Sequence, residues 1–219
     1  MYLAQCTRPD IAFAVNLLTR FSSEPTRRHW NGIKHIFRYL QGTIDLGLFY
    51  SKETISTGLV GYTNAGYKSD PHKARSQTGY VFCYNGIAIS WRSTKQTLVA
   101  TSTNHSEIIS LYEAGKECVW LRSVISHIQS ICQMTPVNNS PTIIYEDNVA
   151  CVAQVKGGYI KGDKTKNISP KFFYTHELQK SRQVDVKQIY SADNLADLFT
   201  KSLPTSTFEK LVYGIYAAS

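Results

Sequence analysis

The stretch TGYVFCYNGIAISW, residues 78–91, carries the clearest local structural signal in the chain. Asn85 and Gly86 separate two apolar runs, 78–84 and 87–91. An Asn-Gly pair between such runs favours a tight two-residue turn, because both turn positions need a positive φ angle. The stretch therefore predicts a β-hairpin of two adjacent antiparallel strands.

The segments around this hairpin predict an α/β domain. Apolar runs at 46–50 and 58–64 favour strands before it, and residues 97–100 are a candidate continuation of the sheet after it. Apolar residues at helical spacing predict a long helix over 103–128. The remaining expected elements are strands at 142–145 and 184–189, and helices at 147–155, at 170–180 and from 193 onward, the last divided by Pro204.

Two amphipathic helices are expected in residues 1–45, over 11–21 and 26–40. The apolar stripe of the second helix consists of Trp30, Ile33, Phe37 and Leu40. Two helices alone cannot bury both stripes. We therefore expect them to dock on a partner that is absent from this chain and to pack weakly on the rest of it.

Composition and charge favour a basic globular protein. A length of 219 residues with 42% hydrophobic content suits one good-sized domain, or one domain plus a short appendage. Lys and Arg number 24 and Asp and Glu number 16, which gives a net charge of +8 and a pI near 9.2. This balance favours polyanionic partners such as nucleic acid, and a soluble basic protein without such a partner is the plain alternative.

The five cysteines are widely spread and show no CxxC spacing, so neither a zinc site nor a disulfide framework is indicated. Reduced thiols fit an intracellular protein, either cytoplasmic or nuclear. No apolar run reaches membrane-spanning length, and no membrane partner is expected. Arg8, Pro9 and Asp10 interrupt any signal-peptide pattern, and the N-terminus reads like a chain entered in the middle of a domain.

Three acids are candidates for one site, and one of them, Asp147, stands at the carboxyl end of a strand, where α/β sheets place ligands. Glu107 lies near the start of the long helix, Asp147 follows a strand, and Asp197 lies early in a late helix. Each alone could be a solvated helix acid, an N-cap or a first-turn acid. Together they suit two-metal cleavage of a phosphodiester, which needs a tight carboxylate cluster around Mg²⁺. A further acid from the central strand beside them would complete the cluster, but that strand carries Asn64.

Several segments resemble the ribonuclease H domain of copia-type LTR retrotransposons. They are GYTNAGY (61–67), RSQTGYVF (75–82), AISWRSTKQ (88–96), EDNVAC (146–151), ISPKFFY (168–174) and LADLFTK (195–201). Residues 7–16 and 28–40 resemble the end of the reverse transcriptase that precedes the ribonuclease H domain in these elements. The sequence is most similar to elements found in plant genomes. The resemblance implies a five-stranded mixed sheet with flanking helices. It divides the chain into a helical reverse-transcriptase remnant at 1–45, a ribonuclease H-like domain at 46–202 and a C-terminal helix or tail at 203–219.

The resemblance places the four catalytic acids of the family on Asn64, Glu107, Asp147 and Asp197, with Asp expected at the first position. It implies Mg²⁺ held by Glu107, Asp147 and Asp197, an RNA–DNA hybrid as substrate and the reverse transcriptase body as partner in the parent polyprotein. Asn keeps a neutral oxygen but loses the charge, so we expect weakened Mg²⁺ binding and impaired cleavage. His105 and Asn167 also depart from the family pattern. A swing of Asp70 into the site is the less favoured compensation.

Two groups of basic residues are candidates for binding nucleic acid. One consists of Lys161, Lys164 and Lys166 in a glycine-rich loop, and the other contains Lys73 and Arg75. A solvated charge run is the alternative for both. Trp91 and Trp120 are expected in the core. Three functions stay open: a working or weakened nuclease, a module that grips hybrid without cutting, and the product of a decayed element.

Overall fold

A five-stranded mixed sheet forms the centre of the molecule. The computed structural model describes residues 1–50, 58–70, 73–134, 140–158 and 169–216. Its strands are β1 (Leu59–Asp70), β2 (Arg75–Tyr84), β3 (Ile87–Lys95), β4 (Thr142–Glu146) and β5 (Val184–Gln188), in the order β3-β2-β1-β4-β5. The pairs β1–β2 and β2–β3 are antiparallel, whereas β1–β4 and β4–β5 are parallel. The expected five-stranded mixed sheet with flanking helices is confirmed.

The predicted hairpin joins β2 to β3. Asn85 and Gly86 have φ angles of 53° and 84°, the signs that a type I′ turn requires at both positions. Tyr84 pairs with Ile87 across the turn. The local signal in residues 78–91 therefore gives the position of the turn and the pairing beside it, and the register shifts by one residue at a bulge between Phe82 and Cys83.

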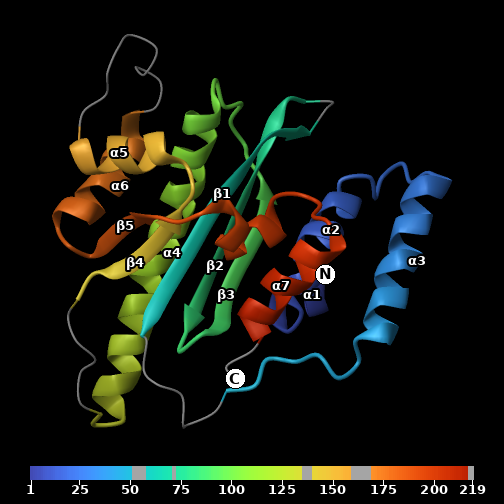
Figure 1. Cartoon of the computed structure of the whole chain (residues 1–219), viewed down its shortest axis with the longest axis horizontal. Helices are drawn as coiled ribbons and strands as arrows, with labels where there is room; N and C mark the ends of the chain where they lie inside the picture. The colour runs from blue at the N-terminus through green and yellow to red at the C-terminus, as the bar shows by residue number, and fades with distance from the viewer. Residues whose placement is uncertain (51–57, 71–72, 135–139, 159–168, 217–219) are drawn as a thin grey trace.

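One face of the sheet is covered by three helices, α4 (Thr103–Ile131), α5 (Val149–Gly157) and α6 (Ser169–Lys180) (Figure 1). Their buried side chains meet alternate residues of the strands, such as Phe82 and Ile144, in one apolar core. α4 packs on the central strand: the Ser110 hydroxyl donates to the Asn64 carbonyl oxygen at 2.7 Å. This contact fixes the first turns of α4 beside the middle of β1.

The opposite face carries α2 (Ala12–Thr19), η4 (Leu195–Phe199) and α7 (Thr205–Tyr216) over a second core (Figure 1). η4 approaches β2 closely at Gly79. A Cβ atom there would lie 2.5 Å from Thr200 Cγ2 and 2.8 Å from Phe199 Cβ. Glycine at this position therefore lets the late segment sit directly on the sheet, which brings Asp197 beside Asn64.

Two expected strands do not form. Residues 46–50 have no regular structure: Leu46 and Leu48 pack on the second core as side chains, and the Tyr50 hydroxyl donates to the Ala88 carbonyl at 2.7 Å. The apolar side chains of this segment thus pack on the core without any strand pairing of its backbone. Residues 97–100 also lie outside the sheet. The late helix begins as two short 3₁₀ turns, η3 (Ser191–Asp193) and η4, before Pro204 and α7.

The N-terminal segment packs more firmly than expected. It consists of α1 (Tyr2–Cys6), η1 (Pro9–Ile11), α2 and α3 (Arg27–Gly42). Asp10 is buried and accepts hydrogen bonds from Arg8, from the Tyr39 hydroxyl at 2.7 Å and from the Tyr216 hydroxyl at 2.6 Å. These bonds link η1, α3 and α7. The expectation of weak packing is therefore wrong for this part of the segment, because a buried polar cluster ties it to the C-terminal helix.

α3 is the more loosely held part, outside α2 and α7 in Figure 1. Its expected apolar stripe is split: Ile33 and Leu40 are half-buried, whereas Trp30 and Phe37 are 58% and 65% exposed. Trp91 is partly buried against the second core, and its indole N–H donates to the Ala4 carbonyl at 2.8 Å. Trp120 is 57% exposed, so its assignment to the core was wrong.

Thiol reactivity would test this packing. Cys83, Cys118 and Cys151 are buried, whereas Cys6 and Cys132 are exposed. Burial raises the pKa of Cys83 to about 12 and that of Cys118 to about 11, which keeps both thiols protonated and unreactive near neutral pH. We expect a thiol-specific chromogenic reagent to titrate two cysteines in the native protein and all five in denaturant. Rapid reaction of a third native thiol would contradict the described cores.

Candidate metal and nucleic-acid site

β4 ends beside the middle of β1. The two strands run parallel, with Tyr62 opposite Tyr145. Asn64 is still within β1, which continues to Asp70, and Asp147 follows directly after the end of β4. α4 begins beside this point and places Glu107 in its second turn. Strand direction and the start of one helix thus bring together residues far apart in sequence.

Glu107, Glu146 and Asp147 form a compact group of acids at this point. One carboxylate oxygen from each lies within 4.8 Å of the other two. The Oε1 atom of Glu146 accepts a hydrogen bond from the Asn148 backbone N–H at 3.1 Å. The Oε2 atoms of Glu107 and Glu146 are buried and have no hydrogen-bond partner within the described part of the chain.

Burial and mutual repulsion act on both glutamates. Burial, and then the charge of Asp147, raises the pKa of Glu107 well above its ordinary value. Burial, and then the charge of Glu107, raises the pKa of Glu146 in the same direction. Both shifts have the sign expected for carboxyls that share a poorly solvated site. A divalent cation would remove this repulsion, since carboxylate oxygens are the ligands that Mg²⁺ and Ca²⁺ prefer. The donor set fits such an ion.

Asn64 and Asp197 form a separate hydrogen-bonded unit beside these acids. The Asn64 Nδ2 amide donates to Asp197 Oδ1 and, at 3.0 Å, to Thr200 Oγ1. The Lys201 ammonium pairs with Asp197 Oδ2 at 2.8 Å. Burial raises the pKa of Asp197, and the Lys201 contact opposes that rise. Both oxygens of Asp197 are therefore engaged by protein groups.

The amide orientation of Asn64 follows from its neighbours. An ionised carboxylate only accepts hydrogen bonds, so the NH₂ group must face Asp197. An aspartate at position 64 would instead set two carboxylates against each other. Asparagine at position 64 thus gives a bonded pair where aspartate would give a repulsive one in the metal-free protein.

The structure brings Asn64, Glu107, Asp147 and Asp197 together beside the end of β4, as sequence reasoning expected. That reasoning quoted Glu146 within a motif but gave it no role. Strand alternation was the available signal, because Glu146 shares the α4 face with buried Ile144. Asp70 does not join the acids: its Oδ2 atom pairs with Lys95 at 3.3 Å.

His105 has a structural contact instead of a place among the acids. Its Nδ1 atom accepts a hydrogen bond from the Thr101 backbone N–H at 3.2 Å, which ties down the start of α4. Burial lowers the pKa of His105, so the ring is neutral near pH 7. The expected binding residues Lys161, Lys164 and Lys166, and the departure at Asn167, lie outside the described residues.

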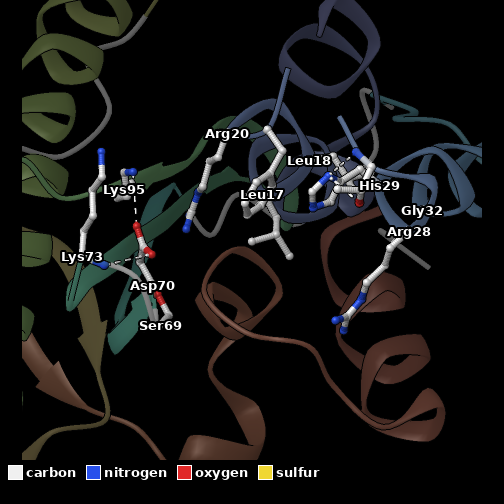
Figure 2. A pocket seen from close by; sticks show the side chains of 12 residues that line it. Leu17, Leu18, Arg20, Arg28, His29, Gly32, Ser69, Asp70, Lys73 and Lys95 are labelled. Atoms are coloured by element: carbon white, nitrogen blue, oxygen red, sulfur yellow. Dashed lines mark hydrogen bonds and ion pairs between the residues drawn. The ribbon is translucent and has the colours of Figure 1, made fainter. Parts of the chain in front are cut away.

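A basic cavity of about 800 Å³ lies between α2, α3 and the end of β1. Figure 2 shows Lys73, Lys95 and Asp70 on its sheet side, with Arg28 and His29 across from them on α3. Lys73 is exposed, and Arg75, the second predicted binding residue at this end, is half-buried at the start of β2. The exposed lining of the cavity is mostly apolar. Its cationic side chains outnumber the acid, so an anionic ligand such as a phosphate backbone would bind through them.

Comparison with known proteins gives relatives of one kind over most of the chain. It is 35% identical over 210 residues to the retrovirus-related Pol polyprotein from transposon TNT 1-94 of Nicotiana tabacum, which covers 95% of this chain. It is 32% identical over 209 residues to the Pol polyprotein from transposon RE2 of Arabidopsis thaliana. The chain spans 15% and 14% of the length of these two relatives.

A shorter relative and a solved structure add to these. The chain is 45% identical over 121 residues to the secreted RxLR effector protein 161 of Plasmopara viticola, covering 55% of this chain and 84% of the effector. The crystal structure of LC11-RNase H1 in complex with RNA/DNA hybrid aligns with a TM-score of 0.45 and 18% identity, over 65% of this chain and 93% of that one. No family model matches the sequence. Among the described residues, no helix has the length and apolar character needed to cross a membrane.

Proposed function

We propose that this chain, which belongs to the retrovirus-related Pol polyproteins of transposons, is the ribonuclease H-like part of a copia-type polyprotein. In this proposal it binds RNA–DNA hybrid. Its ancestral reaction is hydrolysis of the RNA strand, and this reaction is impaired in the present chain. Residues 1–45 would come from the end of the reverse transcriptase, which is the expected neighbour in the parent polyprotein.

The observation that carries this proposal is the gathering of carboxylates beside the end of β4, and a cavity with cationic side chains lies farther along β1, at the end of that strand. Glu107, Glu146 and Asp147 supply the oxygen ligands. Lys73 and Lys95 lie in the cavity at the end of β1, the strand that carries Asn64. Bound Mg²⁺ would supply Lewis-acid stabilisation of the charge that develops at a phosphodiester. The protein would hold the ion with its acids and the hybrid backbone with its cations.

Asn64 favours binding without efficient cleavage as the second candidate function. Its amide bonds Asp197, and Lys201 occupies the other oxygen of that acid. The residues at the first and fourth catalytic positions of the family, Asn64 and Asp197, therefore stabilise each other here. The cationic surface does not depend on either of them, so hybrid binding would persist where cleavage is lost.

Hybrid binding should depend steeply on salt, because each neutralised phosphate releases counterion. We expect the double substitution Lys73→Gln and Arg75→Gln to reduce the slope of log K against log salt by about one per lost phosphate contact. Fluorescence anisotropy of a labelled hybrid, measured in EDTA to prevent cleavage, gives this slope. Lys180→Gln is the matched control, since it removes an exposed charge where α6 leads to the opposite, amino-terminal edge of β5.

An unchanged slope in the double variant, with Lys180→Gln equal to the native protein, would assign Lys73 and Arg75 to a solvated surface. Absence of measurable hybrid binding by the native chain at low salt would contradict the proposed function itself. Mg²⁺-dependent cleavage of the hybrid is the second arm of the test.

A further inference from the structure

The ligand set that the family resemblance implies does not match the arrangement of this chain. Of the four expected positions, Asn64 carries no charge and its amide N–H₂ points at Asp197. Asp197 is held on its other oxygen by the Lys201 ammonium at 2.8 Å. A cation that used Asp197 would have to displace a hydrogen bond and an ion pair. The first and fourth positions therefore offer no free carboxylate oxygen.

Glu146 offers what those two positions lack. Its side chain is fully buried, yet only Oε1 has a hydrogen-bond donor, the Asn148 backbone N–H. Oε2 has no partner among the described residues, and the same holds for Oε2 of Glu107, which is 6% exposed. A buried carboxylate oxygen without a partner is costly. Two such oxygens in one acidic group indicate that the group binds a cation.

The distances suit a single ion. One oxygen each of Glu107, Glu146 and Asp147 lies within 4.8 Å of the others. An ion bound to oxygen at about 2.0–2.6 Å holds its ligand atoms no more than about 4–5 Å apart. Asn148 also caps α5 by accepting from the Cys151 backbone N–H at 3.0 Å, so the backbone that carries Glu146 and Asp147 is fixed at the helix start.

We infer that this chain binds one divalent cation through Glu107, Glu146 and Asp147, with Asp197 outside the ligand set. Glu146 thereby supplies the carboxylate that Asn64 no longer provides. This inference rests on the proposed function only for the class of ion. Its test uses metal alone, without nucleic acid, so that a failure of hybrid binding or cleavage leaves it standing.

Mn²⁺ titration followed by electron paramagnetic resonance of the free ion measures affinity and stoichiometry directly. We expect one site in the native protein. Glu146→Gln, which is isosteric and can still accept from Asn148, should weaken Mn²⁺ binding by about tenfold or more. Asp197→Asn should change the affinity by less than about threefold, because only groups outside the site lose a partner. Asp193→Asn, at an exposed acid of η3, controls for the change in net charge.

Thermal unfolding in EDTA shows whether each variant folds. If Glu146→Gln does not fold, Glu146→Asp keeps the charge but withdraws it by one methylene, and the same loss of affinity is expected. The inference is overturned if Asp197→Asn weakens binding as much as the Glu146 variant does. It is also overturned if the Glu146 variants bind Mn²⁺ as the native protein does, or if the native protein binds no Mn²⁺.

Discussion

Asn64→Asp should raise cleavage of the RNA strand of a hybrid by about a thousandfold over a native chain whose rate is near background. The reason is the charge at the first acid position. Metal ions supply several kcal/mol of transition-state stabilisation, and a loss of about 4 kcal/mol slows a step by about a thousandfold. Aspartate at position 64 would add a carboxylate and release Asp197 from its bond with the Asn64 amide.

The assay is Mg²⁺-dependent cleavage of a labelled hybrid, run in parallel on the native chain and on the variant. Asp147→Asn added to Asn64→Asp should abolish the gained activity, which distinguishes it from a contaminating nuclease. Strong native cleavage that is lost in Asp147→Asn would mean that Asn64 does not impair the site. No cleavage by the revertant would point to further disabling changes, with Asn167 and His105 as the first to restore.

The same substitution should destabilise the metal-free protein. Asn64 Nδ2 now donates to both Asp197 and Thr200. Aspartate could still accept from the Thr200 hydroxyl, but it would lose the bond to Asp197 and face a second carboxylate. Stability that falls in EDTA and returns with Mg²⁺ would show that the two properties are linked through the metal. Asparagine at position 64 thus favours the metal-free fold at the expense of the four-acid arrangement.

The parts of the fold that sequence predicted are those with local causes. The Asn85-Gly86 turn fixes β2 and β3, and helical spacing fixes α4 to within a few residues of its end. Residues 46–50 show the limit of such reasoning. Their apolar pattern is satisfied by packing of Leu46 and Leu48 on the second core, and nothing local distinguishes that from strand pairing.

In the candidate site, too, some features have local causes and others depend on tertiary packing. The positions of Glu107 and Asp147 follow from the start of a helix and the end of a strand. The role of Glu146 depends on which face of β4 it occupies, and that is set by the pairing of β4 with β1 and by the packing of α4. The bond between Asn64 and Asp197 joins residues 133 positions apart. Only the tertiary structure shows that the fourth acid is already engaged.

The second large effect is expected at Asp10, away from the site. Asp10 is 4% exposed and accepts from Arg8 Nε at 3.0 Å and Arg8 Nη2 at 2.7 Å, as well as from the hydroxyls of Tyr39 and Tyr216. Sequence reasoning could not predict this role, since the partner Tyr216 lies 206 positions away. The carboxylate is the acceptor that η1, α3 and α7 share.

Asp10→Asn should lower the free energy of unfolding by about 3–5 kcal/mol, because removing one partner of a buried pair leaves the other charge uncompensated. The new amide would also direct N–H groups at the Arg8 guanidinium or the tyrosine hydroxyls. Urea unfolding followed by circular dichroism gives the loss, and Asp45→Asn, at an exposed acid in the same segment, should change stability by less than about 0.5 kcal/mol. A loss below about 1 kcal/mol for Asp10→Asn would restore the view that residues 1–45 pack weakly. A large loss within a single transition would instead show that this segment and α7 fold together with the sheet.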